Sequence, residues 1–470
     1  MRIASSAVIL ATTCLSACTL STPAQMCPEA QEQVASATEK ILKDSGVPSA
    51  SVGIVENGKI VYSHAFGLAR VQPPLQANAD MAYPIGSISK QFTASAILLL
   101  QQQGKLSVDD PVSKYFPELT EASKVTIRNL LTHTSGYQDY APQDYTIPAW
   151  KIPGDPLKVV HEFAGKPLDF EPGTQWQYSN TNFVLAALIV QKVSGEPFAK
   201  FLRENVLDRA HLSHVLNLNT EQDKLQVTGY MRNALAPVRP AALEGPGWYF
   251  GDADLAMPVA SLLQWDLTFI DQSLLSPASY KQMETSFVLK DGTDSHYGFG
   301  VGVRTILGQR AIEHSGEVGG FVAENIVFPE AHAAVAVLTN QEASGAASEI
   351  AKSILPMILG HNSATANGGA DAFAPKLKGI VSGLAQGKID RSLFTSDANS
   401  YFNHDALDDF RTSLAPFGSV TSVTKERGAL RGGMQFARYR VAFSSGSAIA
   451  VSTYLEPDGK IEQLLVEGKE

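Results

Sequence analysis

Ser87 and Lys90 are a pair whose types and spacing suit nucleophilic catalysis. They stand three residues apart, at the start of an apolar, helix-like stretch over 91–103 that Gly104 ends. On a helix, residues three apart share one face, so the hydroxyl and the amine come within hydrogen-bond reach. The start of a helix favours negative charge by up to about 1 kcal/mol, which helps an alkoxide and disfavours a lysine cation. A buried Lys90 can then accept the proton of Ser87, although so short a motif also occurs by chance.

Tyr178 and Asn180 are a second candidate pair. They lie in a loop-like stretch, just before an apolar helical run over 183–193. A tyrosine near a lysine can relay protons, and an asparagine amide can hold both Lys90 and a substrate carbonyl. By itself a tyrosine in a loop is more often a packing residue, so this pair gains weight only beside Ser87 and Lys90.

His314, Ser315 and Gly316 form the third candidate group, at the predicted end of a strand. A strand edge with a glycine lets a substrate backbone lie alongside. The amide of the next residue, Glu317, can pair with the amide of Ser87 as an oxyanion hole. A single histidine is more often a structural residue, so this group too depends on the other two.

The composition excludes several classes of function. The chain has 470 residues, room for two or three domains, and 44% apolar residues, as in a packed globular protein. Its 37 lysines and arginines against 47 aspartates and glutamates give a net charge of -10, which repels phosphate backbones, so nucleic acid is not an expected partner. With only Cys14, Cys18 and Cys27 and no cluster of metal ligands, we expect no disulfide framework, no metal and no cofactor.

The first 28 residues have the pattern of an export and anchoring signal. A short positive start and an apolar run of small residues predict a signal peptide over 1–17, and the run is too short to span a bilayer as a lasting helix. Its end resembles the lipobox of bacterial lipoproteins, in which cleavage leaves Cys18 to carry the lipid. We expect a periplasmic protein held to a membrane only by lipid at Cys18, with a tether over 18–28. The alternative is an ordinary cleaved signal with an incidental cysteine.

The elements that must position the three groups come from both ends of one domain. A helix is expected over 29–45 and a hairpin over 51–62, turning at Asn57 and Gly58. Further strand-like sequence appears only at 300–305 and 324–338, after a long region with helical periods and many loops. An open sheet assembled from both ends, with a largely helical insertion, predicts an α/β domain over 29–361.

A second, smaller domain is expected after a flexible linker over 362–374. Helices are predicted over 375–386 and 405–414, and alternating strands over 437–443 and 449–455, with a last strand over 460–466. Helices followed by an antiparallel sheet favour a small α+β domain over 375–470. Its pattern resembles the nuclear transport factor 2-like domains, and it contains no catalytic set of its own.

Taken together and in order, S-x-x-K, Y-x-N and H-x-G resemble the motifs of the serine β-lactamase and penicillin-binding protein superfamily. The Tyr-Ser-Asn and His-x-Gly versions are similar to those of the branch of class C β-lactamases, DD-peptidases and esterases. The stretches 126–136 and 180–193 resemble the same branch, and the likeness covers about residues 30–360. It implies the β-lactamase/transpeptidase-like fold, a central antiparallel sheet flanked by helices plus a mainly helical region.

The resemblance also assigns roles. It implies that Ser87 attacks a carbonyl and becomes acylated, that Lys90 and Tyr178 share the role of base, and that water then hydrolyses the ester. For substrate binding it implies Asn180, His314, Ser315 and Gly316. It further implies that the amides of Ser87 and Glu317 stabilise the oxyanion and that His133 orders a nearby loop.

Two departures from the family pattern bear on the substrate. Class C β-lactamases usually carry lysine where this chain has His314, and small residues are more usual than Glu317. Both lower the positive potential that attracts a substrate carboxylate, so we expect neutral or cationic acyl substrates in preference to penicillins.

Two functions follow from this sequence. The first is a hydrolase of the DD-peptidase, D-aminopeptidase, esterase or β-lactamase type, acting on a small molecule or a peptide. The alternative is an envelope sensor that binds a cell-wall peptide or a penicillin with slow or no turnover. The intact set of Ser87, Lys90, Tyr178 and Asn180 favours the enzyme. The oligomeric state is not indicated.

Overall fold

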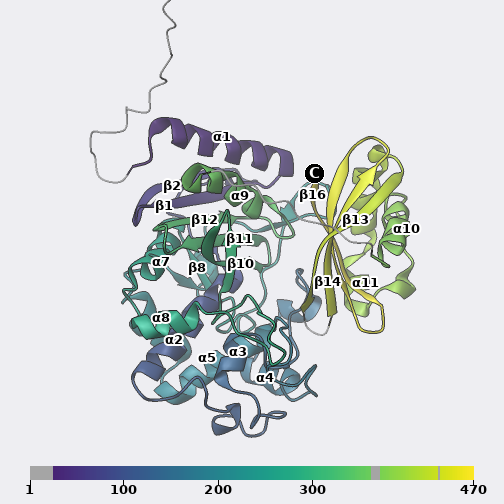
Figure 1. Ribbon diagram of the computed structural model, residues 1–470. Coiled ribbons are helices and arrows are strands. Elements are labelled where there is room, and N and C mark those ends of the chain that lie inside the picture. The colour runs from purple at the N-terminus through teal and green to yellow at the C-terminus, as the bar shows by residue number, and fades with distance from the viewer. Residues whose placement is uncertain (1–24, 361–370, 432–433, 470) are drawn as a thin grey trace, which may run out of the picture.

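A computed structural model describes residues 25–360, 371–431 and 434–469 (Figure 1). The predicted signal over 1–17, the lipidation site Cys18 and most of the tether and the linker lie outside these residues. Within the described ranges, no helix is both long and apolar enough to cross a membrane. Cys27, at the start of the first helix, is a free, half-buried thiol.

Seven antiparallel strands form the main sheet, in the order β3-β2-β1-β12-β11-β10-β9. Its first hairpin turns at Asn57 and Gly58, whose φ angles of 51° and 69° suit the predicted two-residue turn. Because β1 pairs with β12, the sheet joins the two ends of the larger domain, as predicted. Its strands are β1 Ser49–Glu56, β2 Lys59–Arg70, β3 Leu75–Gln76, β9 Gly302–Ile306, β10 Gln309–Val318, β11 Phe321–Phe328 and β12 Ala333–Thr339.

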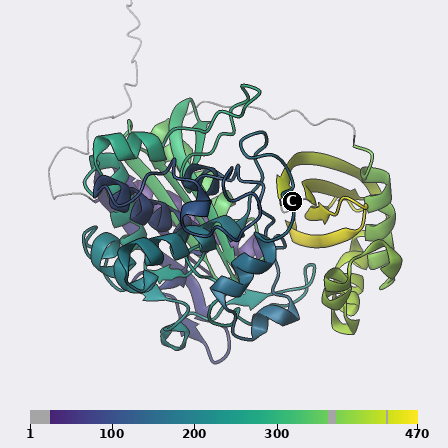
Figure 2. The same cartoon turned by 90° about the horizontal axis from the view of Figure 1, so that it is seen from below.

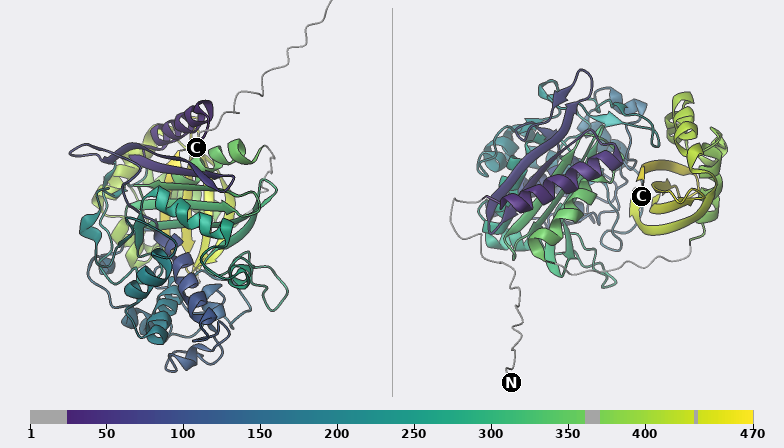
Figure 3. Two further views of the ribbon diagram at one scale, coloured as in Figure 1. Left: turned by 90° about the vertical axis from the view of Figure 1, so that its left-hand side faces the viewer. Right: turned by 90° about the horizontal axis from the view of Figure 1, so that it is seen from above.

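Helices cover both faces of this sheet (Figure 3). α1 (Pro28–Ser45) and α9 (Ala346–Leu359) pack on one face, and α7 (Val259–Asp271) packs on the other. Successive side chains of a strand point to opposite faces. Val337 of β12 therefore joins the core under α1 and α9, whereas its neighbour Leu338 joins the core on the side of α7.

A mainly helical region lies on the side of α7 and carries the first two motifs (Figures 1 and 2). At its centre, α2 (Ser89–Gln102) packs against α5 (Asn180–Ser194), and every residue of α2 up to Leu100 is buried. The region also contains α3 Ile127–Leu131, α4 Pro156–Phe163, α6 Phe198–Leu202, α8 Pro277–Met283, β4 Tyr83–Pro84, β5 Leu216–Asn217, β6 Tyr230–Met231, β7 Arg239–Pro240 and β8 Leu255–Met257.

The C-terminal residues form a separate four-stranded antiparallel sheet, in the order β13-β14-β15-β16. Helices pack on one face of it, and the other face is turned toward the larger domain (Figures 1 and 2). Its core joins Phe410 and Leu414 of a helix to Tyr439 and Val441 of a strand. The elements are α10 Ala374–Leu384, α11 Ser396–Tyr401, α12 His404–Leu414, β13 Val420–Arg431, β14 Met434–Phe443, β15 Ala448–Leu455 and β16 Ile461–Lys469.

The predicted fold class is confirmed, with local differences. Ser87 lies in a 3₁₀ turn over Gly86–Ile88 rather than in the α-helix, which begins at Ser89, two residues before the predicted stretch. His314 lies in the middle of β10 rather than at its end, since that strand stays paired with β11 up to Val318. The strand-like stretch over 324–338 contains parts of two strands, β11 and β12. β13 was not predicted at all.

Candidate active site

Ser87 and Lys90 meet as their spacing predicts. Ser87 lies half-buried in the 3₁₀ turn that leads into α2, and Lys90 lies fully buried in the first turn of that helix. Nζ of Lys90 is 2.9 Å from Oγ of Ser87. The nucleophile and the amine are therefore in direct hydrogen-bond contact.

The other partners of Lys90 leave an electron pair for Ser87. Nζ also lies 2.7 Å from Oδ1 of Asn180 and 3.0 Å from the carbonyl oxygen of Asp252. Both oxygens can only accept hydrogen bonds. When Lys90 gives up its proton, its two remaining N–H groups can be donated to these oxygens, which leaves its lone pair for the hydroxyl of Ser87. This geometry suits Lys90 as the proton acceptor.

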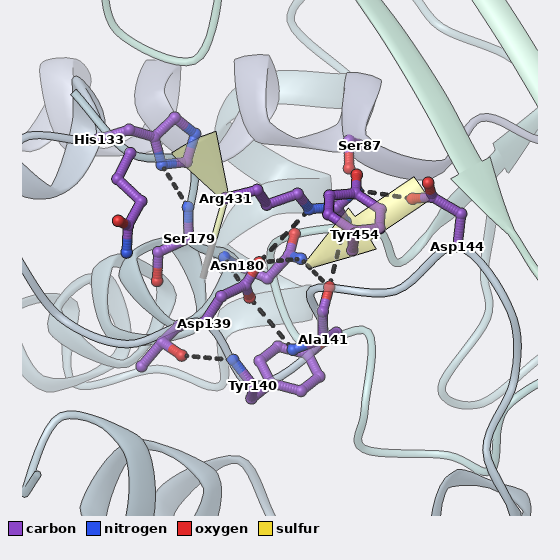
Figure 4. Close-up of polar contacts among 12 residues, drawn as sticks. Ser87, His133, Asp139, Tyr140, Ala141, Asp144, Ser179, Asn180, Arg431 and Tyr454 are labelled. Carbon is purple, nitrogen blue, oxygen red and sulfur yellow. Dashed lines mark hydrogen bonds and ion pairs between the residues drawn. The ribbon is translucent and has the colours of Figure 1, made fainter. Parts of the chain in front are cut away.

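Asn180 can present only its oxygen to Lys90. Its Nδ2 donates to the carbonyl oxygen of Ala141 at 3.0 Å and to Oδ2 of Asp139 at 3.3 Å. Its backbone N–H donates to Oδ1 of Asp139 at 2.8 Å. With the amide nitrogen engaged in this way, Oδ1 faces Lys90. Asp139 and Ala141 thus position Asn180 (Figure 4).

Tyr178 lies in the cavity wall beside Lys90. Its ring centre is 5.0 Å from Nζ of Lys90 and 5.2 Å from the guanidinium carbon of Arg431, a residue of the C-terminal domain. The rings of His133 and His314 lie 4.3 Å and 6.2 Å from it, centre to centre. The position is compatible with the predicted sharing of a proton with Lys90, a role that stays a prediction.

His314 is a neutral wall residue. Its Nδ1 lies 2.6 Å from the carbonyl oxygen of Ser315, so Nδ1 carries the proton, and Nε2 accepts from the hydroxyl of Tyr297 at 2.7 Å. Burial, and next the charge of Lys90, lower the pKa of His314 to about 3. His314 and Ser315 line the cavity and Gly316 follows them in β10, so this motif shapes the site without moving protons.

Gly86 and Gly316 let two backbones touch beside the nucleophile. A Cβ on Gly316 would overlap the carbonyl oxygen of Ile85 and lie 3.1 Å from the amide nitrogen of Ser87. A Cβ on Gly86, whose φ is +52°, would lie 2.5 Å from the amide nitrogen of Glu317. The amides of Ser87 and Glu317 are therefore neighbours at the nucleophile, where two N–H groups can hold an oxyanion.

His133 orders the loop that carries Tyr178. It is fully buried, its Nδ1 accepts from the backbone N–H of Ser179 at 3.2 Å, and its carbonyl oxygen accepts from the N–H of Gln177 at 2.9 Å. Burial, and next the charge of Lys90, lower the pKa of His133 well below its ordinary value, so the ring is neutral. These contacts are compatible with the predicted structural role, which stays a prediction.

A cavity of about 350 Å³ opens at Ser87 and has an acidic lining. Six carboxyl side chains line it against two arginines, Arg427 and Arg431, and the six include Glu244, Asp252, Glu317 and Glu342. Burial raises the pKa of Glu244 to about 7, that of Asp252 to about 6 and that of Glu342 to about 8. Burial also raises the pKa of Glu317 well above its ordinary value. Among the residues described, no group of three or more His, Cys, Asp or Glu is placed to hold a metal ion.

Sequence reasoning misses Asp139, Asp144 and Arg431. Each depends on contacts between segments far apart in the chain, which a motif does not reveal. One signal was available: Gly432-Gly433 directly follows Arg431 and precedes an alternating strand, a pattern typical of a hairpin.

The fold and the contacts of Ser87, Lys90 and Asn180 are those of the serine β-lactamase and transpeptidase class. A profile of the Beta-lactamase family matches residues 34–355, and the chain belongs to that family.

Known relatives resemble either much of the larger domain or nearly the whole chain. PbpX of Bacillus subtilis (strain 168) is 32% identical over 260 residues, which are 55% of this chain and 63% of that protein, so the match spans less than two thirds of this relative. The structure of a D-stereospecific amidohydrolase from Streptomyces sp. aligns with a TM-score of 0.60 and 25% identity over 70% of this chain and 99% of that one. An octameric penicillin-binding protein homologue from Pyrococcus abyssi shares the fold over 94% of this chain and 98% of its own, with a TM-score of 0.61 and 22% identity.

Proposed function

We propose that the protein hydrolyses an amide or an ester through an acyl-enzyme on Ser87. The observation that carries the proposal is the contact of Ser87 with Lys90, whose other two partners are oxygens that can only accept hydrogen bonds. Oγ of Ser87 attacks the carbonyl carbon while Lys90 takes its proton, and the oxyanion lies between the amides of Ser87 and Glu317. The leaving group departs with a proton from Lys90 or Tyr178, and water then hydrolyses the ester.

The substrate carries a neutral or cationic group on its acyl side. Glu317, Glu342 and Glu244 line the cavity, and burial raises their pKa values, to about 7 for Glu244 and about 8 for Glu342. Once these groups ionise, a substrate carboxylate meets like charge there and a free amine meets opposite charge. Small molecules and peptides with such an amine, cell-wall peptides among them, are the first candidates, and the likeness to a D-stereospecific amidohydrolase makes D-amino-acid amides the first choice.

Three probes test this preference: a D-alanine p-nitroanilide with a free amine, its N-acetylated form and a penicillin. We expect kcat/KM to fall in that order, and all turnover to vanish in Ser87→Ala. A penicillin turned over faster than both anilides would contradict the proposed substrate class. If an acyl label instead persists for hours, the protein is the envelope sensor of the alternative function.

We further propose that the enzyme works in the periplasm, attached to a membrane by lipid at Cys18. The support is the lipobox-like sequence that ends at this residue. Cys18→Ser should move the protein from the membrane fraction to the soluble fraction. Retention of this variant in the membrane would contradict the anchor.

A further inference from the structure

Arg431 belongs to the C-terminal domain but lies in the wall of the catalytic cavity (Figure 4). Its Nη1 donates to Oδ1 of Asp144 at 2.6 Å and to the hydroxyl of Tyr454 at 2.9 Å. Its Nη2 donates to the carbonyl oxygen of Ala141 at 3.1 Å, and its Nε is 3.6 Å from Oδ2 of Asp139. The guanidinium thus fastens the loop 139–144 to the C-terminal sheet.

Two of these partners are the groups that orient Asn180. The carbonyl oxygen of Ala141 and the carboxylate of Asp139 accept from Asn180 as well as facing Arg431. Asn180 in turn presents Oδ1 to Lys90. A continuous set of contacts therefore runs from Arg431 through Asp139 and Ala141 to the amine beside Ser87.

Arg431 also touches the loop of the second motif. Its backbone forms a β-bridge with that of Tyr178, and its guanidinium carbon lies 5.2 Å from the centre of that ring. Polar and aromatic contacts from the C-terminal domain thus reach both members of the second motif, Tyr178 directly and Asn180 through its partners.

We infer that Arg431 is a positioning residue of the active site, supplied by the C-terminal domain, which holds Asp139 and Ala141 so that Asn180 presents its oxygen to Lys90. The inference rests on the proposed acyl-enzyme function. Nη1 and Nη2 of Arg431 already donate to protein oxygens, which distinguishes this residue from a cation that recognises a substrate carboxylate.

Arg431 also matters for the charge of Asp139, whose side chain has no exposed surface. Burial raises the pKa of Asp139. This rise is opposed first by the charge of Arg431, then by hydrogen bonds from the backbone of Ala141 and Asn180, and last by the charge of Lys90. The remaining titratable groups that face Asp139 are Asp169, Asp252 and Tyr140. Removal of Arg431 therefore raises the pH at which Asp139 ionises.

The test measures acylation of the full chain by p-nitrophenyl acetate between pH 5 and 9. Arg431→Gln should slow acylation by about 10- to 100-fold, the loss expected when reacting groups are displaced by about 1 Å. The acidic limb of its kcat/KM profile should move to higher pH, since Asp139 loses the stabilising charge of Arg431. Arg431→Lys keeps the charge without the planar fork, so it should restore the acidic limb but not the full rate.

A matched control removes a cation elsewhere on β13. Lys425 faces Asp371 within the C-terminal domain, with 3.7 Å between Nζ and Oδ2, so Lys425→Gln should leave the rate and the profile unchanged. In an Asp139→Asn background, Arg431→Gln should reduce the acylation rate less than it does in the wild type, because the Asp139 charge that Arg431 offsets is absent.

The outcomes separate the two proposals. If the wild type is not acylated, the proposed function fails. If the wild type is acylated and Arg431→Gln reacts at the same rate with the same profile, the positioning role is overturned. If Arg431→Gln does not fold, Arg431→Lys and the Asp139→Asn pair decide. Acylation of Arg431→Lys at the wild-type rate would also overturn the positioning role. So would a loss of acylation rate in Arg431→Lys that is equally large with and without Asp139→Asn.

Discussion

At the scale of the residue, activation of Ser87 depends on what surrounds one nitrogen atom. Lys90 is fully buried, and its amine contacts the hydroxyl of Ser87 and two oxygens that only accept. A base in such a position accelerates proton transfer by about 10²- to 10⁴-fold. The same contacts also fix Lys90 in place, so no large movement is needed before the reaction.

Lys90→Ala should therefore slow acylation by about 10²- to 10⁴-fold while the protein stays folded. Lys90→Arg should be as slow, because a guanidinium stays protonated and cannot accept the proton of Ser87. Stopped-flow kinetics with a reactive ester measure both rates, and circular dichroism checks the fold. Acylation of Lys90→Ala within a few-fold of the wild type would rule out Lys90 as the base.

The acidic cavity predicts a pH dependence that differs between substrates. Glu244 and Glu342, with pKa values raised to about 7 and about 8, are protonated below these values and negative above them. For an ester with a permanent trimethylammonium group on its acyl side, KM should therefore fall between pH 6 and 9. For the neutral tert-butyl analogue, KM should stay flat. Parallel profiles for the two esters would contradict the binding of a cation at these carboxylates.

At the scale of the element, the approach of β10 to the turn before α2 builds the oxyanion site. Gly316→Ala should push the two backbones apart, because its Cβ would overlap the carbonyl oxygen of Ile85. We expect acylation to fall by about 10²- to 10³-fold, the loss seen when one oxyanion donor is removed. The matched control is Gly468→Ala in β16, where a Cβ meets nothing within 4 Å and activity should be retained. Equal activity of the two variants would refute the oxyanion assignment.

Prediction from the sequence succeeded where a signal is local. The hairpin at Asn57 and Gly58 and the apolar helix after Ser87 each have a strong short-range pattern, and both are present. β13 was missed because its residues are mostly polar and do not alternate, so only pairing with β14 identifies it. The three motifs were found for the same local reason, whereas Asp139 and Arg431 become site residues only through tertiary contacts.

At the scale of the whole molecule, the described residues of the two domains touch in several regions, one of them near the active site and another away from it. Near the active site, the backbone N–H of Asp144 donates to Oε1 of Gln463 at 2.6 Å. Away from it, Asp409 of α12 accepts from Nη2 of Arg239 at 3.0 Å and from Nδ2 of Asn233 at 3.0 Å. The second contact region therefore holds the C-terminal domain in place without touching the nucleophile.

Asp409→Ala should loosen this contact. Its side chain is 12% exposed and that of Arg239 is 45% exposed, so solvent weakens the pair and the loss should be about 1–2 kcal/mol. Urea unfolding measures the change in the free energy of unfolding. The control is Asp408→Ala on the same helix, which removes an exposed pair with Arg411 and should change little. Equal losses in the two variants would contradict the docking role of Asp409.

The central claim is that Ser87 becomes acylated, and intact-mass spectrometry tests it most directly. The chain without residues 1–18 is mixed with a reactive ester or with a penicillin, beside Ser87→Ala. The account predicts a stoichiometric adduct or ester turnover in the wild type and neither in Ser87→Ala. A folded wild type that neither probe labels, or an adduct that persists in Ser87→Ala, would contradict it.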